Sequence, residues 1–419
     1  MTRLGLFLCI LLLWTSVYAQ KDKAVYRPEK RSGVIEEISH ETDSLRAIAD
    51  SITDAIRNSR PEDREHLRLR FDIAGLDRPK SLDEFKTQFH FPPLGQFKTG
   101  TCWCFSTTSF IETEMFRQTG QKIKLSEMFT VYYEYVEKAR HFVQNRAHDW
   151  NGEGSESNAV IEIMKHYGAV PADVYSGHID NRRFDHSKMS DEITAYFEFV
   201  DKNNLWDEDV VVGSVKLILN KYMGEPPRSF IYNDETITPR EFLSRVMKIN
   251  LDDFVSVMST LQTPFYMRGK FDVWDNWRND SSYYNVPLRD WYNAIKQAII
   301  RGYTVELGGD ISEPGYIGDE DIALIPDFDI PQISINQDSR ELRFYNESTT
   351  DDHGIHVVGY ENRGDHDWFL IKDSSRRLAQ GKFEGYVFYR DDYIRLKMLA
   401  FMVHKDALDN GLKKKLGIN

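Results

Sequence analysis

One short segment, Gln96 to Phe105, constrains the fold of this chain more than any other. Gly95 and Gly100 bracket a loop, and a helical pattern begins directly after it, at Cys102. A cysteine in the first turn of a helix lies at the positive end of the helix dipole, beside N–H groups that the helix does not use, and both stabilise a thiolate. The segment therefore predicts a nucleophilic cysteine at a loop-to-helix junction. An inert buried cysteine is the alternative, because free cysteines are among the most buried residues.

A thiolate nucleophile needs a partner for proton transfer and donors for the oxyanion that it creates. The side-chain amide of Gln96, together with the backbone N–H of Cys102, can supply these donors. The pattern Gln-x5-Cys-Trp-x-Phe resembles the nucleophile region of papain-superfamily cysteine peptidases. In that family Cys102 would be the nucleophile and Gln96 the oxyanion donor. The resemblance also implies substrate binding by Trp103, in the same motif, and by Gly152 and Gly154, which stand where the family has a glycine pair.

The partner of the nucleophile is expected in the run from Asp352 to Tyr360. His353 is followed six and seven residues later by Gly and Tyr, as in the family's histidine motif. Asp373 stands where the family has the Asn that orients the imidazole, and an Asp accepts the same hydrogen bond and favours imidazolium. We interpret His356 as a core histidine. A metal site would need further ligands in register, so neither a metal nor another cofactor is expected.

The spacing of the motifs indicates a branch of the superfamily. Cys102 and His353 are 251 positions apart, whereas papain-type spacing is about 130–150, so roughly a hundred residues are inserted. The insert contains Gly-Glu-Pro-Pro at 224–227 and Asp-Asp-Phe-Val-Ser-Val at 252–257. These runs resemble the branch of bleomycin hydrolase and aminopeptidase C, and the resemblance covers about residues 85 to 415.

The secondary-structure pattern predicts an α+β fold, because helical stripes dominate the first part of the chain and short β-type runs dominate the last third. The helices are expected at 102–117, 126–143, 158–167 and 288–301, and the strands at 303–307, 356–360, 368–372 and 385–389. The resemblance implies a papain-like arrangement, with a helical left subdomain and a β-barrel-like right subdomain. The expected divisions are a signal peptide (1–19), an N-terminal arm and helix (20–80), the left subdomain with the nucleophile (81–190), an inserted helical region (191–287) and the β-rich right subdomain with the histidine and the C-terminal tail (288–419).

The first 19 residues have the pattern of a secretory signal peptide. Arg3 precedes an apolar run, Leu4–Trp14, and small residues end at Ala19, so we expect cleavage after Ala19 and export to the periplasm or beyond. An uncleaved anchor is the alternative, but the run is shorter than the roughly 20 residues that span a bilayer. After cleavage Cys102 and Cys104 remain, too close along a helix for a normal disulfide. We expect no stable membrane insertion, since no later stretch is apolar enough.

The resemblance implies an aminopeptidase acting on peptide substrates, and the signal-peptide pattern adds the expectation that it is exported. The resemblance also implies a homo-oligomer, a hexamer in that branch, and a C-terminal tail, Leu416–Asn419, whose carboxylate would pair with the substrate's N-terminus in the cleft. A cysteine endopeptidase and a catalytically inactive peptide-binding homologue are the alternatives. The formal net charge of -13 repels phosphate backbones, so nucleic acid is not an expected partner.

Overall fold

The computed structural model of this chain describes residues 69, 71–147, 152–179, 183–375 and 381–418. The expected signal peptide (1–19), the helix near residues 43–56 and the N-terminal arm up to residue 68 lie outside the described residues. All of the elements given below belong to one compact unit of the chain.

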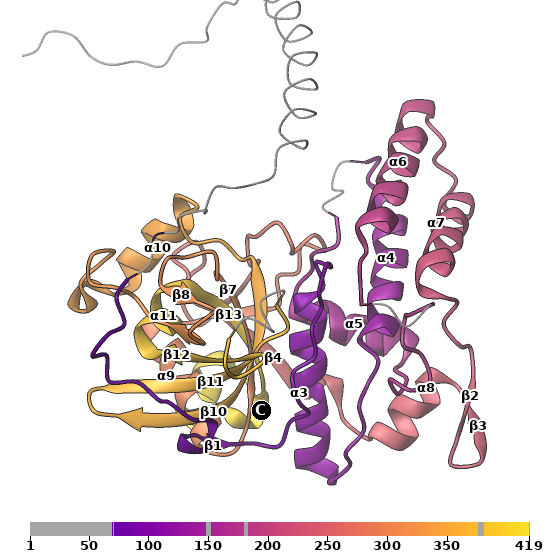
Figure 1. Cartoon of the computed structure of the whole chain (residues 1–419). Helices are drawn as coiled ribbons and strands as arrows, with labels where there is room; N and C mark the ends of the chain where they lie inside the picture. The colour runs from indigo at the N-terminus through magenta and orange to yellow at the C-terminus, as the bar shows by residue number, and fades with distance from the viewer. Residues whose placement is uncertain (1–68, 70, 148–151, 180–182, 376–380, 419) are drawn as a thin grey trace, which may run out of the picture. The chain divides into compact units, whose positions relative to one another are not determined.

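Helices dominate the first part of the described chain (Figure 1). They are α3 (Cys102–Thr119), α4 (Glu127–Gln144), α5 (Ser157–Tyr167), α6 (Ser187–Asn203) and α7 (Glu208–Met223). The first three confirm the expected helices, and local sequence explains their ends. Gly120 ends α3 in the left-handed region at φ 73°, which glycine adopts without steric cost. The Ser126 side chain starts α4 by accepting a hydrogen bond from the N–H of Phe129.

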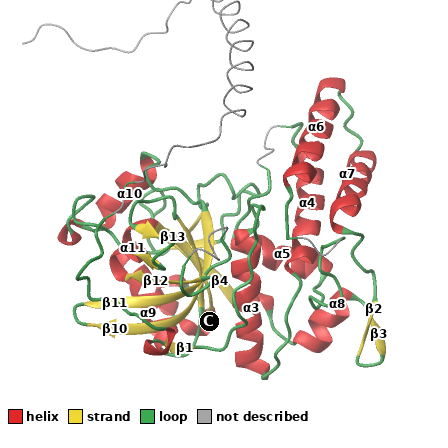
Figure 2. Ribbon diagram, in the orientation of Figure 1, coloured by secondary structure: helices red, strands yellow, loops and turns green. Residues whose placement is uncertain are grey.

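The second part of the chain is built on a single large sheet (Figure 2). Its 11 strands run in the order β5-β6-β4-β13-β7-β10-β11-β12-β9-β8, and β1 also pairs with β10. Neighbours are antiparallel except the pairs β12–β9 and β4–β6. The strands are β1 (Lys86–Thr87), β4 (Phe254–Met258), β5 (Arg268–Gly269), β6 (Tyr283–Asn285), β7 (Val305–Gly309), β8 (Tyr316–Ile317), β9 (Ile322–Ala323), β10 (His353–Arg363), β11 (His366–Lys372), β12 (Tyr386–Arg390) and β13 (Met398–His404).

Shorter elements connect and flank these two parts. The helices beside the sheet are α9 (Leu288–Ile300), α10 (Gln337–Tyr345), α11 (Asp391–Lys397) and α12 (Asn410–Leu416). A separate hairpin, β2 (Phe230–Tyr232) and β3 (Glu235–Ile237), precedes α8 (Pro239–Glu241), which runs into a π-helical turn, η2 (Phe242–Met247). Single 3₁₀ turns are η1 (Leu82–Glu84), η3 (Leu251–Asp253), η4 (Gln332–Ser334) and η5 (Lys405–Ala407).

The region 191–287, expected to be helical, also supplies strands β4, β5 and β6 to the large sheet. The sequence pattern did not reveal β4, because four of its five residues are buried and a strand covered on both faces shows no alternation of apolar and polar residues. β13, with all seven residues buried, escaped prediction for the same reason. The domain boundaries given above stay a prediction.

The two parts meet where α3 packs against β10 and β7. Gly354, in β10, is the point of closest approach, since a Cβ there would lie 2.8 Å from Ser106 Oγ and 3.2 Å from Trp103 Cα. A larger residue at this position would push the helix away from the strand. The glycine thus lets Cys102, at the start of α3, lie beside His353, at the start of β10.

Candidate active site

Cys102 is the first residue of α3 and is partly exposed. The loop that leads into it is held by Glu153, whose carboxylate accepts a 2.6 Å hydrogen bond from the Gly100 N–H. The Glu153 carbonyl oxygen accepts from the Trp103 indole at 3.2 Å, and its carboxylate also pairs with His186. Glu153 therefore fixes the loop on one side of the cysteine and the first turn of the helix on the other.

His353 begins β10, and its ring lies between the cysteine and an aspartate. Its Nε2 is 2.7 Å from Asp373 Oδ1, and the side chain of Cys102 lies close enough to interact with the ring. Burial by itself lowers the pKa of His353, but the charge and hydrogen bond of Asp373 and the contact with Cys102 raise it well above the usual value. The geometry therefore favours an imidazolium beside the thiol.

Asp373, just after β11, is buried and has a partner for each oxygen. Oδ1 also accepts from the Ser375 N–H at 2.8 Å, and Oδ2 accepts from the Tyr316 hydroxyl at 3.0 Å. Burial raises the pKa of this carboxyl, but the positive charge of His353 and these hydrogen bonds lower it below the usual value. The sequence did not indicate Tyr316, because it lies 57 positions from Asp373 in a two-residue strand.

Gln96 is buried and is tied to the segment that follows Asp373. Its backbone N–H donates to the Ser374 carbonyl at 2.9 Å, and its Oε1 accepts from Ser374 Oγ at 2.8 Å. Its Nε2 donates to the Thr99 carbonyl at 2.8 Å. An amide nitrogen carries two hydrogens, so one remains for another acceptor.

A small cavity lies beside the thiol and the imidazole, and both Cys102 and Trp103 line it together with His353. Gly152 and Gly154, expected to bind substrate, do not line it. Their carbonyl oxygens instead accept hydrogen bonds from Lys138 Nζ. The residues that follow them do line the cavity, namely Ser155, Glu156 and Ser157.

Comparison with known proteins now identifies the family. The Peptidase C1-like family model matches residues 80–417. The chain belongs to this family. Aminopeptidase C of Listeria monocytogenes is 23% identical over 261 residues and that of Listeria innocua 25% over 263 residues, each match covering 52% of this chain and 58% of the relative. The matched part thus spans little more than half the length of these relatives.

A solved structure supports the same assignment. The crystal structure of PepW from Lactobacillus rhamnosis superposes with a TM-score of 0.66 and 15% identity, over 93% of this chain and 95% of that chain. Identity this low establishes the fold alone. The family model and the PepW structure confirm the α+β, papain-like fold, and the Aminopeptidase C relatives support the expected branch of bleomycin hydrolase and aminopeptidase C.

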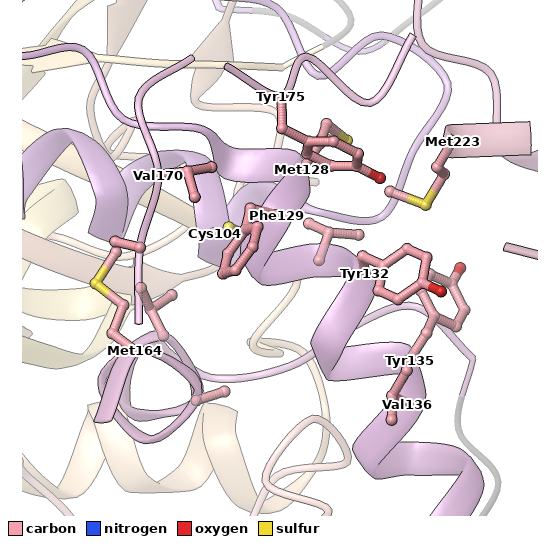
Figure 3. Close-up of a cluster of buried hydrophobic side chains, with 14 of the residues drawn as sticks. Cys104, Met128, Phe129, Tyr132, Tyr135, Val136, Met164, Val170, Tyr175 and Met223 are labelled. Carbon is pink, nitrogen blue, oxygen red and sulfur yellow. The ribbon is translucent and has the colours of Figure 1, made fainter. Parts of the chain in front are cut away.

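Cys104 and His356 both lie in the core of this C1-like chain, and the position of His356 agrees with its interpretation as a core histidine. Cys104 is fully buried, and its thiol donates to the Glu127 carbonyl at 3.3 Å. It packs among apolar side chains of the helical part, including Phe129 (Figure 3), and burial raises the pKa of its thiol well above the usual value. His356 is fully buried, with Nδ1 2.8 Å from Ser109 Oγ.

The expectation that the C-terminal tail occupies the cleft is wrong for the residues described, which end at Ile418. Leu412 and Leu416, on α12, are buried in the apolar core beneath the large sheet, and Ile418 packs against the same core. The described residues of the tail, up to Ile418, do not line the cavity beside Cys102. A short tail with apolar residues at this spacing gains more by burying them than by extending into a polar cleft.

Sequence reasoning also missed the carboxyl groups that surround this cavity. They are Glu156, Asp275, Glu306, Asp351 and Asp352. One signal was available: Glu306 interrupts an apolar run in β7, a strand whose residues are otherwise buried or nearly so.

In the described ranges, no helix is long and apolar enough to cross a membrane. The described residues also contain no group of three or more His, Cys, Asp or Glu arranged to hold a metal ion.

Proposed function

We propose that this chain is a cysteine peptidase that hydrolyses peptide bonds through an acyl-enzyme. The observation that carries the proposal is the interaction of the Cys102 side chain with His353, whose Nε2 is 2.7 Å from Asp373 Oδ1. The proton of the thiol moves to the imidazole, and Asp373 holds the resulting imidazolium in its orientation. An inert cysteine would need no such partner, and Cys104, two residues away, has none.

The reaction follows in two steps. The Cys102 thiolate attacks the scissile carbonyl carbon, and the backbone N–H of Cys102 and the free hydrogen of Gln96 Nε2 stabilise the oxyanion. His353 then donates its proton to the leaving amine as the C–N bond breaks and a thioester forms. In the second step neutral His353 accepts a proton from water as the oxygen attacks the thioester. The acid product leaves, and the thiol is restored with the proton from the imidazolium.

Labelling and substitution test this assignment directly. Iodoacetamide should alkylate Cys102 rapidly, and tandem mass spectrometry of the modified peptide distinguishes Cys102 from Cys104. The Cys102→Ala variant should hydrolyse no peptide amide. Rapid labelling without hydrolysis of any peptide would instead favour the inactive peptide-binding homologue, whereas labelling at Cys104 alone would overturn the assignment.

We infer that the enzyme is an aminopeptidase, supported by the Aminopeptidase C relatives. An endopeptidase is the second candidate, and one observation favours it. A groove of about 620 Å³ adjoins the cavity, shares Asp275 and Asp351 with it, and is lined by aromatic side chains such as Phe344 and Tyr345. A longer chain could continue along such a groove. Mass spectrometry of the fragments from an unblocked decapeptide separates stepwise removal of N-terminal residues from internal cleavage.

We further propose export, supported by the charge, apolar run and small residues of residues 1–19. N-terminal sequencing of the native protein should find Gln20 first, and an intact Met1 would contradict this. A homo-oligomer is proposed from the resemblance to the aminopeptidase C branch, and light scattering of the purified protein measures its mass.

A further inference from the structure

The cavity beside Cys102 and His353 has an unusually acidic lining. Five carboxyl side chains line it, and its lining includes no lysine or arginine of the described chain. They converge from separate parts of the fold: one just before α5, one in the loop between β5 and β6, one in β7 and two just before β10. These residues are Glu156, Asp275, Glu306, Asp351 and Asp352.

The carboxyl groups receive few hydrogen bonds from the described residues around them. Glu156 is 7% exposed, and its Oε2 accepts from the Tyr283 hydroxyl at 3.3 Å. Its Oε1 is buried and receives no hydrogen bond from the described residues. Asp351 lies against the Glu156 side chain, and the two carboxyl groups share a hydrogen bond that requires one of them to keep its proton. Glu306 accepts from the Ser106 hydroxyl at 3.0 Å. A buried acceptor without a donor is costly unless a ligand supplies one.

The pKa shifts of these carboxyl groups also favour a ligand with a positive charge. Burial raises the pKa of Glu156 and of Glu306 to about 8, and repulsion from neighbouring carboxylates adds to the effect. Burial and the Glu156 carboxylate raise the pKa of Asp351 well above the usual value. At neutral pH these groups therefore hold protons that a cation with its own donors can replace.

The size of the cavity selects the kind of cation. Its volume is about 20 Å³, enough for one group the size of water. An ammonium group has this size and carries three donors, whereas a planar guanidinium is larger. A metal ion is a poorer fit, because these carboxyls do not form a group with metal-binding geometry among the described residues.

We propose that Glu156, Glu306 and Asp351 form a binding site for an ammonium group of the substrate, on the acyl side of the bond to be cleaved. The inference rests on the proposed peptidase function, because it places the ammonium next to the thiol that attacks. Two sources share this chemistry: the free N-terminus of a peptide and the side chain of a lysine. Carboxylates of the body of the fold would then take the role that the resemblance gave to the C-terminal tail.

Two matched pairs of coumarin amides distinguish these sources. Alanyl and N-acetyl-alanyl amides differ in the N-terminal ammonium. N-acetyl-lysyl-alanyl and N-acetyl-norleucyl-alanyl amides differ in the side-chain ammonium. The ratio of kcat/KM within each pair measures the contribution of the ammonium group alone, because changes in the catalytic groups affect both members of the pair equally.

The Glu156→Gln and Glu306→Gln variants should each lower one of these ratios by about tenfold. Glu162→Gln is the matched control, since Glu162 lies on α5 near Glu156, is largely exposed and pairs with Lys165; both ratios should stay at the wild-type values. A fall in the first ratio assigns the site to the N-terminus, and a fall in the second assigns it to lysine. If both Gln variants stay folded by circular dichroism and neither ratio falls, the proposal is wrong.

A binding measurement separates this proposal from the proposed function. Calorimetry on Cys102→Ala compares alaninamide with N-acetyl-alaninamide, and lysinamide acetylated at its α-amine with the norleucine equivalent. At least one charged ligand should bind more tightly than its neutral partner, and adding Glu156→Gln should abolish the preference. This result would stand even if no amide were hydrolysed, whereas hydrolysis without any charge preference would leave the function intact and refute the site.

Discussion

Replacing Asp373 by Asn removes the charge of the group that orients His353 and keeps its shape. Oδ1 accepts from His353 Nε2 and from the Ser375 N–H, while Oδ2 accepts from the Tyr316 hydroxyl. In Asp373→Asn the remaining oxygen keeps the first two contacts. The new amide nitrogen can donate to the Tyr316 oxygen, so all three contacts persist without the charge.

The size of the effect follows from the contacts. A hydrogen bond to a charged group contributes about 1.5–3 kcal/mol and a neutral one about 1 kcal/mol, so the charge contributes about 0.5–2 kcal/mol. One pKa unit corresponds to about 1.4 kcal/mol. The pKa of His353 should therefore fall by about one unit, and kcat/KM at neutral pH by about tenfold or less. The alkaline limb of the pH profile should shift to lower pH, because it reports loss of the imidazolium proton.

Asp373→Ala should lower both activity and stability much more than Asp373→Asn does. It leaves three donors in a buried site without their acceptor, the His353 ring, the Ser375 N–H and the Tyr316 hydroxyl. Each unsatisfied buried donor costs about 1–3 kcal/mol, so the free energy of unfolding should fall by several kcal/mol. The imidazole also loses its orientation, and kcat/KM should fall by about a hundredfold or more.

The assay is kcat/KM for an aminoacyl-coumarin amide from pH 5 to 10, with urea unfolding at pH 5.5. The folded pKa of Asp373 is lowered and that of His353 is raised. Their pairing is therefore fully present between the unfolded values of about 4 and about 6.5. It is lost as the pH falls through the folded pKa of Asp373 or rises through that of His353. Tyr316→Phe keeps the charge and should move the alkaline limb little. An unchanged limb in Asp373→Asn, or wild-type activity in Asp373→Ala, would refute the reasoning.

Three further experiments, with four substitutions and one deletion, test the placement of other residues. Cys102→Ala should abolish hydrolysis, while Cys104→Ala should keep most of kcat/KM and lower Tm, because Cys104 fills the core; the opposite pattern would reverse their roles. Glu153→Ala should lower kcat/KM several-fold by releasing the Gly100 N–H, and Glu153→Gln should restore most of it; equal activity of both variants and wild type would show that the loop needs no such anchor. Deleting Leu416–Asn419 should lower Tm, since burying a leucine contributes about 1.5–3 kcal/mol. The ratio of turnover of free to N-blocked substrates should stay unchanged; a changed ratio would indicate that the tail lies in the cleft.

The parts of this fold that could be predicted are those with local causes. A cap such as Ser126 or Gly120 fixes a helix end within a few residues, so α3, α4 and α5 were predicted closely. The nucleophile motif is equally local, because the loop, the helix start and Cys102 are consecutive. His353 and Asp373 follow because each stands within a short run that resembles the family's own.

The parts that could not be predicted depend on long-range packing. The strand β4 reaches the sheet only by pairing with β13, about 150 residues later, and no local pattern records that pairing. The same holds for the carboxyl groups of the cavity, since Glu156 and Asp351 are almost 200 residues apart. Each is an ordinary acidic residue in the sequence, and only tertiary packing makes them neighbours.

The pH dependence of stability tests whether Glu306, an acidic residue in strand β7, is held protonated in the folded protein. Its folded pKa is raised to about 8 by burial, while the unfolded value is about 4.3. Between these values the folded state holds a proton that the unfolded state has lost, so stability falls as the pH rises from about 5 to about 8. Glu306→Gln retains an acceptor for Ser106 and cannot ionise, so its free energy of unfolding should fall less over this range, while ammonium selectivity is reduced. Urea unfolding at pH 5, 6.5 and 8 measures the difference, with Glu162→Gln expected to follow the wild type. If the free energy of unfolding has the same pH dependence in wild type and Glu306→Gln, the Glu306 carboxyl is not held protonated by its surroundings. The argument that Glu306 is available to bind an ammonium group would then fail.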